Sequence, residues 1–331
     1  MGASNSGNSP NSIFAIFTKS TKITFMRGML GHLSKGTQFL FLLLLCIFSL
    51  SVFAIMAAAA MKFIFQVGDV FDMEQLAETN NSRIISALKF SQLLNSVGLF
   101  IVPPVLFSFL VSSNSSDYLG FTKKNKTSNY FLVFLIMLVS LPFLNWMIEW
   151  NESIQLPESL SALEEMMKES EKKATELTKM LLKAHTMGDL LFNLALIAII
   201  PALGEELLFR GVVQKLFSEI FKNPHAAIIT TAILFSFLHF QFYGFFPRTF
   251  FGILFGYMLV WSGSIKLPIL AHLVNNSMVV LANFYGNDNG LSQTLDNIGK
   301  SESVWWAIAS MTFLSVLMFV LYKNTFQKEW I

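Results

Sequence analysis

The chain has 331 residues, of which 53% are apolar, 13% are charged and 35 are phenylalanine. This composition excludes an ordinary soluble domain and predicts a polytopic membrane protein that lipid surrounds over most of its length. The net charge is +2, and no basic patch is interleaved with aromatic residues, so we predict no nucleic-acid partner.

Eight apolar runs are long enough, or nearly so, to cross a hydrocarbon core of about 30 Å. They are rich in leucine and phenylalanine and lack the alternating ten-residue pattern of a membrane β-barrel. We therefore predict an all-α bundle with about eight transmembrane helices, although the sixth run is short for a span. The predicted spans are 38–61, 90–112, 129–150, 188–204, 225–246, 248–261, 268–284 and 304–322.

The loop charges predict the orientation, because cytoplasmic loops of membrane proteins collect lysine and arginine. The two loops predicted on the opposite side are acidic, QVGDVFDMEQLAETNN and YGNDNGLSQTLDN. Both termini are therefore predicted to be cytoplasmic. The basic residues on the cytoplasmic side of this topology are Lys19, Lys22, Arg27, Lys35, Lys123, Lys124, Lys126, Lys215, Lys222, Lys266, Lys323 and Lys328.

The chain divides into four predicted parts. Residues 1–36 form a flexible cytoplasmic tail, and residues 37–187 hold the first three spans and an amphipathic excursion. Residues 188–284 form the catalytic core, and residues 285–331 hold the last span and a short tail. The excursion repeats apolar residues at helical spacing, which predicts an amphipathic helix between the third and fourth spans. Its charges form a solvated face or, alternatively, belong to a lid over the bundle.

Ionisable side chains inside membrane helices cost about 3 kcal/mol or more, so they indicate functional sites by default. Here they concentrate in the fourth to seventh spans. The same region contains a G-x-x-x-G sequence, GILFG, which is suited to close helix packing. The candidate polar residues are Glu205, Glu206, Arg210, His239, His272 and Asn276.

Residues four apart share a helix face, so Glu206 and Arg210 are predicted to form an ion pair. Glu205 is turned by about 100° from Glu206 and faces elsewhere. The same rule places His272 and Asn276 on one face, where a ring nitrogen and an amide converge.

The heights of two candidate residues also agree. Glu205 lies 18 residues before Asn223 and His239 lies 16 residues after it, so in an antiparallel hairpin the two side chains are nearly level. They are predicted to share a water molecule. Phe235 lies one turn before His239 and is predicted to form an apolar wall beside the imidazole.

Three motifs follow in order, EELLFR at 205–210, FSFLH at 235–239 and HLVNN at 272–276. In these motifs the chain resembles the CAAX prenyl endopeptidases, also described as the CAAX protease and bacteriocin-processing family of intramembrane proteases. The resemblance covers about residues 188–284. It implies that Glu205 and His239 activate water and that His272 and Asn276 bind the oxyanion.

The residues themselves support this chemistry, because amide hydrolysis needs a base, a positioned water and donors aimed at the developing oxyanion. Glu205 is the predicted base, and Glu206 with Arg210 supports the helix. Two alternatives are open for the catalytic chemistry. Either no cofactor takes part, or a divalent metal such as zinc is held by Glu205, His239 and His272.

The predicted function is hydrolysis of a peptide or protein substrate within the bilayer, with C-terminal prenylated CAAX peptides as one substrate class that the resemblance implies. Two other classes remain open. One is a transporter in which the same side chains form an ionisable relay, which inverted repeats would support. The other is a non-catalytic bacteriocin-immunity scaffold. Loss of hydrolysis in Glu205→Ala, with partner binding retained, separates the enzyme from both.

Overall fold

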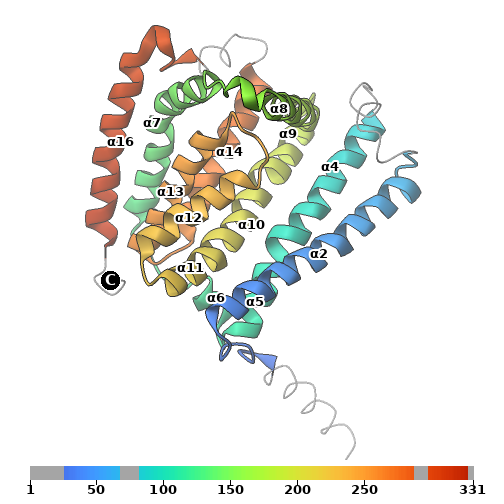
Figure 1. Ribbon diagram of the computed structural model, residues 1–331, viewed down its shortest axis with the longest axis vertical. Coiled ribbons are helices and arrows are strands. Elements are labelled where there is room, and N and C mark those ends of the chain that lie inside the picture. The colour runs from blue at the N-terminus through green and yellow to red at the C-terminus, as the bar shows by residue number, and fades with distance from the viewer. Residues whose placement is uncertain (1–25, 68–81, 287–296, 327–331) are drawn as a thin grey trace, which may run out of the picture.

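The computed structural model describes residues 26–67, 82–286 and 297–326. Every regular element in these ranges is helical, which confirms the predicted all-α bundle (Figure 1). The tail up to residue 25 and most of the two acidic loops, 68–81 and 287–296, lie outside the described residues.

Seven helices are long and apolar enough to cross a membrane, so the protein is a multi-pass membrane protein. The orientation of its termini stays a prediction. The seven are α2 (Lys35–Phe63), the interrupted helix Ser82–Val111, α7 (Thr127–Glu152), the interrupted helix Met187–Phe221, α13 (Phe245–Ser262), α14 (Lys266–Gly286) and Ser301–Thr325, which contains α16 (Val304–Thr325).

The eighth apolar segment, α12 (Pro224–Phe237), is shorter than the sequence pattern predicted. The prediction carried this helix to residue 246, whereas the chain turns after Phe237 and α13 begins at Phe245. Fourteen residues rise only about 21 Å, less than the hydrocarbon thickness of about 30 Å. The helix therefore ends before it can span a bilayer, and His239 lies in the turn that follows it.

Figure 1 shows three groups of helices side by side. The helices α2 and α4 (Ser82–Ser96) form one edge, and α7 and α16 form the opposite edge. Between them lie the interrupted helix Met187–Phe221 and the helices α12, α13 and α14. The three motifs belong to this central group, so the candidate site lies inside the bundle.

Two spans contain wide π-helical turns. The second span passes from α4 through η1 (Val97–Ile101) into α5 (Val102–Val111), whose second and third residues are prolines. Proline has no N–H to donate and its ring crowds the preceding turn, so a wider turn accommodates it. The fourth span is divided in the same way into α9 (Met187–Asn193), η3 (Leu194–Ile199), α10 (Ile200–Leu208), η4 (Phe209–Val213) and α11 (Gln214–Phe221).

The predicted close packing at the G-x-x-x-G sequence is present between α13 and α12. A Cβ atom added at Gly252 would lie 2.7 Å from the Cβ atom of Ala232, and one at Gly256 would lie 2.8 Å from Ile228. Any larger residue would therefore push the two helices apart. The close approach leaves the carbonyl oxygens of both glycines within reach of side chains on the fourth span.

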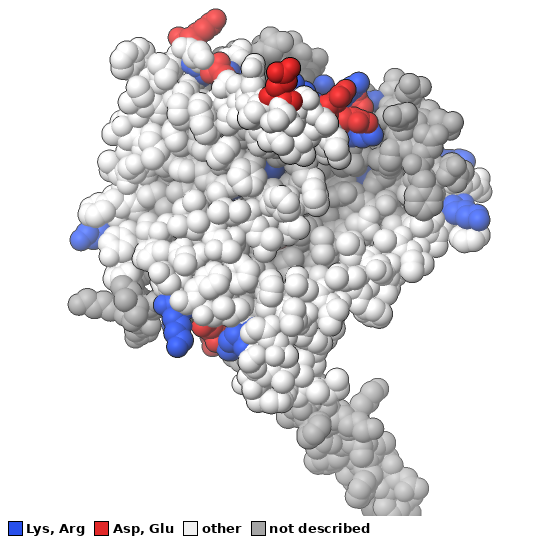
Figure 2. Space-filling view, viewed as in Figure 1, with Lys and Arg blue, Asp and Glu red and all other residues white. Residues whose placement is uncertain are grey.

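The predicted amphipathic helix is α8 (Ser161–Leu182), and it lies across the end of the bundle. Its inner face contacts the turn after α12, where Ser170 Oγ donates to the carbonyl of Phe240 at 3.1 Å. Figure 2 shows charged side chains gathered at the two ends of the molecule, with a broad uncharged belt between them. This distribution fits a bilayer around the belt, with α8 at one of its surfaces.

A buried lysine that the sequence analysis overlooked holds the corner between α8 and α9. Lys89 on α4 is 7% exposed, and its Nζ donates to Asn193 Oδ1 at 2.7 Å and to the carbonyl of Lys183 at 3.0 Å. Asn193 Nδ2 in turn donates to the carbonyl of Leu182 at 2.9 Å. These bonds satisfy carbonyls at the end of α8 and fix where the fourth span begins.

Candidate active site

The fourth span provides the acidic residues of the site. Glu206 on α10 and Arg210 in η4 are fully buried, and Arg210 Nη1 donates to Glu206 Oε1 at 3.0 Å. This confirms the predicted ion pair. The other terminal nitrogen, Nη2, donates to the carbonyl of Gly252 on α13 at 3.2 Å. Arg210 therefore links the acidic helix to the neighbouring helix while it neutralises one carboxylate.

His272 on α14 lies between the two glutamates. Its Nδ1 is 2.9 Å from Glu206 Oε1, and its Nε2 is 3.8 Å from Glu205 Oε2. A carboxylate bound to arginine can only accept, so Nδ1 carries a hydrogen and donates to Glu206, while Nε2 faces Glu205. Glu206 therefore orients His272, a role that the sequence spacing did not indicate.

His239 lies in the turn after α12 and is held in the same manner. Its Nδ1 is 2.8 Å from the carbonyl oxygen of Phe235, which can only accept, so Nδ1 donates and Nε2 is left with the lone pair. The ring also lies edge-on against Phe235, with 4.8 Å between the centroids. The predicted apolar wall beside the imidazole is present.

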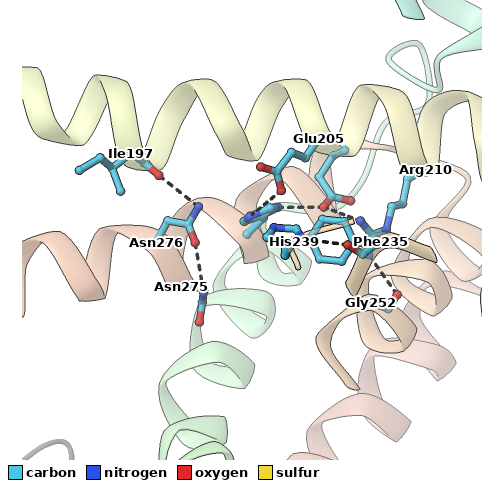
Figure 3. A network of polar contacts seen from close by, with 10 residues as sticks. Ile197, Glu205, Arg210, Phe235, His239, Gly252, Asn275 and Asn276 are labelled. Carbon is cyan, nitrogen blue, oxygen red and sulfur yellow. Dashed lines mark hydrogen bonds and ion pairs between the residues drawn. The ribbon is translucent and has the colours of Figure 1, made fainter. Parts of the chain in front are cut away.

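Phe235 is 3% exposed and contacts several members of the site at once. Its ring centroid lies 6.2 Å from the centroid of His272, and Arg210 Cζ lies 4.9 Å from that of Phe235. The two histidines therefore meet on one phenylalanine, although they come from different helices. The structure brings Glu205, His272 and His239 into one neighbourhood, and the described contacts join Glu205 to His272 rather than directly to His239 (Figure 3).

Asn276 follows His272 by one turn, as predicted, and makes a contact that the sequence analysis did not foresee. Its Nδ2 donates to the carbonyl oxygen of Ile197 at 3.2 Å. Pro201 stands four residues after Ile197 and has no N–H to offer that carbonyl, so Asn276 replaces the missing helical bond. Asn275 Nδ2 donates to Asn276 Oδ1 at 3.2 Å and so orients the amide.

The residues of the site fall into a fully buried group and a partly exposed group. Glu206 and Arg210 are 0% exposed, whereas Glu205 and Asn276 are partly exposed, as is His239. The surface is hollowed below α8, beside α4 (Figure 2). Glu205, His239 and Asn276 are therefore partly accessible, while the ion pair behind them is inaccessible.

The sequence analysis missed one charged residue near the site. Arg248 stands at the start of α13 and is half-buried, and it interacts electrostatically with both Glu205 and His239. Arg248 was not predicted to belong to the site because it occurs in an aromatic stretch at the edge of a short predicted span. The available signal was a lone arginine directly after an aromatic and proline run, FFPR.

The three residues of the metal alternative offer suitable atoms, because Glu205 Oε2 and both histidine Nε2 atoms are free to bind. Nevertheless, within the described ranges no group of three or more His, Cys, Asp or Glu side chains is arranged to hold a metal ion. Arg210 and Arg248 also place positive charge near Glu205. The side chains as placed therefore do not fit a resident divalent metal.

The fold and the site define a class: a helical multi-pass membrane protein with a carboxylate–histidine centre inside its bundle. Residues 187–278 match the protein-family model described as Rce1-like, type II CAAX prenyl endopeptidase Rce1-like, which confirms the family resemblance over this region. The matched residues include all three motifs, so the likeness covers the candidate site. No curated protein and no solved structure matches the chain.

Proposed function

We propose that the protein is an intramembrane endopeptidase that hydrolyses a peptide bond with a water molecule activated by Glu205 and positioned by His239. The observation that carries this proposal is the chain of contacts Arg210–Glu206–His272–Glu205, in which one carboxylate is neutralised and the other is 12% exposed. A structural ion pair alone does not require a second carboxylate facing a histidine.

In the proposed reaction, the carboxylate of Glu205 takes a proton from water as the water oxygen attacks the scissile carbonyl carbon. His239, with its lone pair on Nε2, accepts the other hydrogen bond of that water and fixes its orientation. The bond to the leaving nitrogen then breaks, and that nitrogen takes up a proton.

His272 is suited to deliver this proton. Its Nε2 lone pair faces Glu205 Oε2 at 3.8 Å, so it can receive the proton from Glu205 and pass it to the leaving amine. This differs from the role that the family resemblance implied, because in the proposed reaction Nε2 of His272 takes up and passes on a proton rather than donating to an oxyanion. Asn276 keeps a second N–H on Nδ2 for the oxyanion.

The family match supports one substrate class. We propose a peptide or protein with a C-terminal CAAX sequence as the substrate. The expected cofactor requirement is none, and a chelator should leave the rate unchanged.

The test is hydrolysis of a quenched C-terminal peptide by detergent-purified protein, with and without a prenyl group on its cysteine. Glu205→Gln keeps the size of the side chain and removes the base, so we expect the rate to fall by about 10² to 10⁴-fold. Full activity in Glu205→Gln would refute the mechanism. Loss of wild-type activity in chelator, restored by added zinc, would refute its metal-free form.

The transporter and the immunity scaffold remain outcomes of this experiment rather than proposals. A wild-type protein that cleaves no peptide of the set, and that moves protons or solute in a Glu205-dependent way, is a transporter. A protein that cleaves nothing and keeps its partner in Glu205→Gln is a scaffold.

A further inference from the structure

The turn between α12 and α13, residues 238–244, carries His239 and has an unusual backbone conformation. Phe240, the residue after His239, has a φ angle of +52°, in the left-handed region that bulky side chains seldom adopt. Such a conformation costs about 1–3 kcal/mol and persists only where surrounding contacts hold it. The Phe240 side chain is 69% exposed, so its own packing supplies little of that support. Contacts from other elements are therefore needed to hold the turn.

Helix α8 supplies such contacts, although it lies 70 residues earlier in the sequence. Ser170 Oγ donates to the carbonyl of Phe240 at 3.1 Å. The two carboxylate oxygens of Glu171 accept from Gln241 Nε2 and from the backbone N–H of Tyr243, both at 3.4 Å. Two neighbouring residues of α8 are thus bound to three residues of the turn.

Helix α13 holds the same turn from the other side. Arg248 Nη1 donates to the carbonyl of Gln241 at 3.3 Å, and Arg248 Nη2 donates to Gln241 Oε1 at 2.9 Å. The guanidinium of Arg248 and the carboxylate of Glu171 also attract each other electrostatically. The Gln241 side chain therefore gives its N–H group to Glu171 and its oxygen to Arg248, and it is clamped at both ends.

The position of the His239 ring depends on both of its flanks. On the α12 side, His239 Nδ1 donates to the carbonyl of Phe235 at 2.8 Å. On the other side, the chain enters the left-handed residue and then the clamped Gln241. A catalytic group must be held to within about 0.5 Å of its productive position, so loosening either flank should slow the reaction.

We propose that Glu171 of α8 is a positioning residue for His239, because it holds the strained turn together with Arg248 through Gln241. This inference rests on the proposed endopeptidase function and adds to it a residue that lies outside the three motifs. The competing explanation is that Glu171 only attaches α8 to the bundle. The two explanations differ in whether the effect of Glu171 on turnover requires His239.

A double-mutant cycle makes this distinction. Glu171→Ala should lower kcat by about 10- to 100-fold, because a small misplacement of a catalytic group has an effect of this size, and KM should change by less than about twofold. In a His239→Ala background the same change should alter the remaining kcat by less than about twofold, because the residue through which Glu171 acts is absent. Equal fold-losses in the two backgrounds would show that Glu171 acts independently of His239.

Three further variants complete the test. Glu169→Ala removes a carboxylate of the same helix that pairs with Lys173 and is 61% exposed, so kcat should stay at the wild-type value. Gln241→Ala removes the clamped side chain from the other side and should reproduce the loss, even where Glu171→Ala does not fold. The exchange Glu171→Gln/Gln241→Glu should stay within about fivefold of the wild type in kcat, because an amide and a carboxylate still face each other. An exchange variant as slow as Glu171→Ala would contradict the inference.

One readout does not depend on hydrolysis. Diethyl pyrocarbonate modifies neutral imidazole rings, and mass spectrometry measures the rate at each histidine. Releasing the turn in Glu171→Ala should raise the rate at His239 by at least about threefold, because local opening exposes the ring, and leave the rate at the exposed His225 unchanged. An unchanged rate at His239 would overturn the inference.

The outcomes separate this inference from the proposed function. If the wild type cleaves peptide and Glu171→Ala keeps full kcat, only the inference is wrong. If the wild type cleaves no peptide, the proposed function is wrong, and the modification rates still decide whether Glu171 holds His239.

Discussion

The buried pair of Glu206 and Arg210 allows stability and catalysis to be separated by a double-mutant cycle. Both side chains are 0% exposed, and Glu206 Oε2 and Arg210 Nε have no hydrogen-bond partner in the described structure. Glu206→Leu leaves a buried guanidinium without its anion, and Arg210→Met leaves a buried carboxylate without its cation. Each should lower the free energy of unfolding by about 3–5 kcal/mol.

The double variant Glu206→Leu/Arg210→Met should cost less than either single change, because no unpaired charge remains and two unsatisfied atoms are removed. Additive losses would instead total about 6–10 kcal/mol. Reversible unfolding in detergent micelles, followed by circular dichroism, measures the four values. The reasoning fails if the double variant loses the sum of the single losses.

Activity should not follow stability in this cycle. Glu206 also accepts from His272 Nδ1 at 2.9 Å, and no residue replaces that acceptor in the double variant. The stabilised double variant should therefore remain about 10²-fold or more below the wild type in kcat. A double variant that recovers both stability and turnover would show that Glu206 has no part in orienting His272.

Three further predictions concern packing and backbone satisfaction. Gly252→Ala should destabilise the protein by about 1–3 kcal/mol and lower kcat, because it separates the helices that hold the site, and a thermal shift with a rate assay checks both. Asn276→Ala should cost about 1–3 kcal/mol alone and less in a Pro201→Ala background, where a backbone N–H is restored; equal costs in both backgrounds would contradict this explanation. Lys89→Met should cost about 1.5–3 kcal/mol and raise proteolysis at the corner between α8 and α9, measured by limited digestion. An unchanged digestion pattern in Lys89→Met would argue against its role there.

Contacts within one helix could be predicted from the sequence. The i,i+4 rule gave the Glu206–Arg210 pair, which is present at 3.0 Å. The same periodicity gave the amphipathic α8 and the close approach at Gly252 and Gly256. Such contacts depend only on helix geometry, which is nearly the same in every protein.

Contacts between helices could not be predicted in this way. His272 lies 66 residues after Glu206, and their contact depends on how α10 and α14 pack against each other. The end of α12 at Phe237 was also unpredictable, because no proline or charged residue stands near that end of the helix. Lys89 was missed for a simpler reason, because it precedes the predicted start of its span by one residue.

The irregular backbone of the fourth span and the position of the site are linked through the hydrogen bonding of one backbone carbonyl. A regular helix from 187 to 221 satisfies its own carbonyls and offers none to its neighbours. Pro201 frees the carbonyl of Ile197, and Asn276 on α14 fills the vacancy with one amide N–H. The bond that repairs the backbone therefore also fixes the helix that carries His272. Because repair and catalysis use one amide, substitutions at Pro201 should lower turnover even though Pro201 contacts no reacting atom.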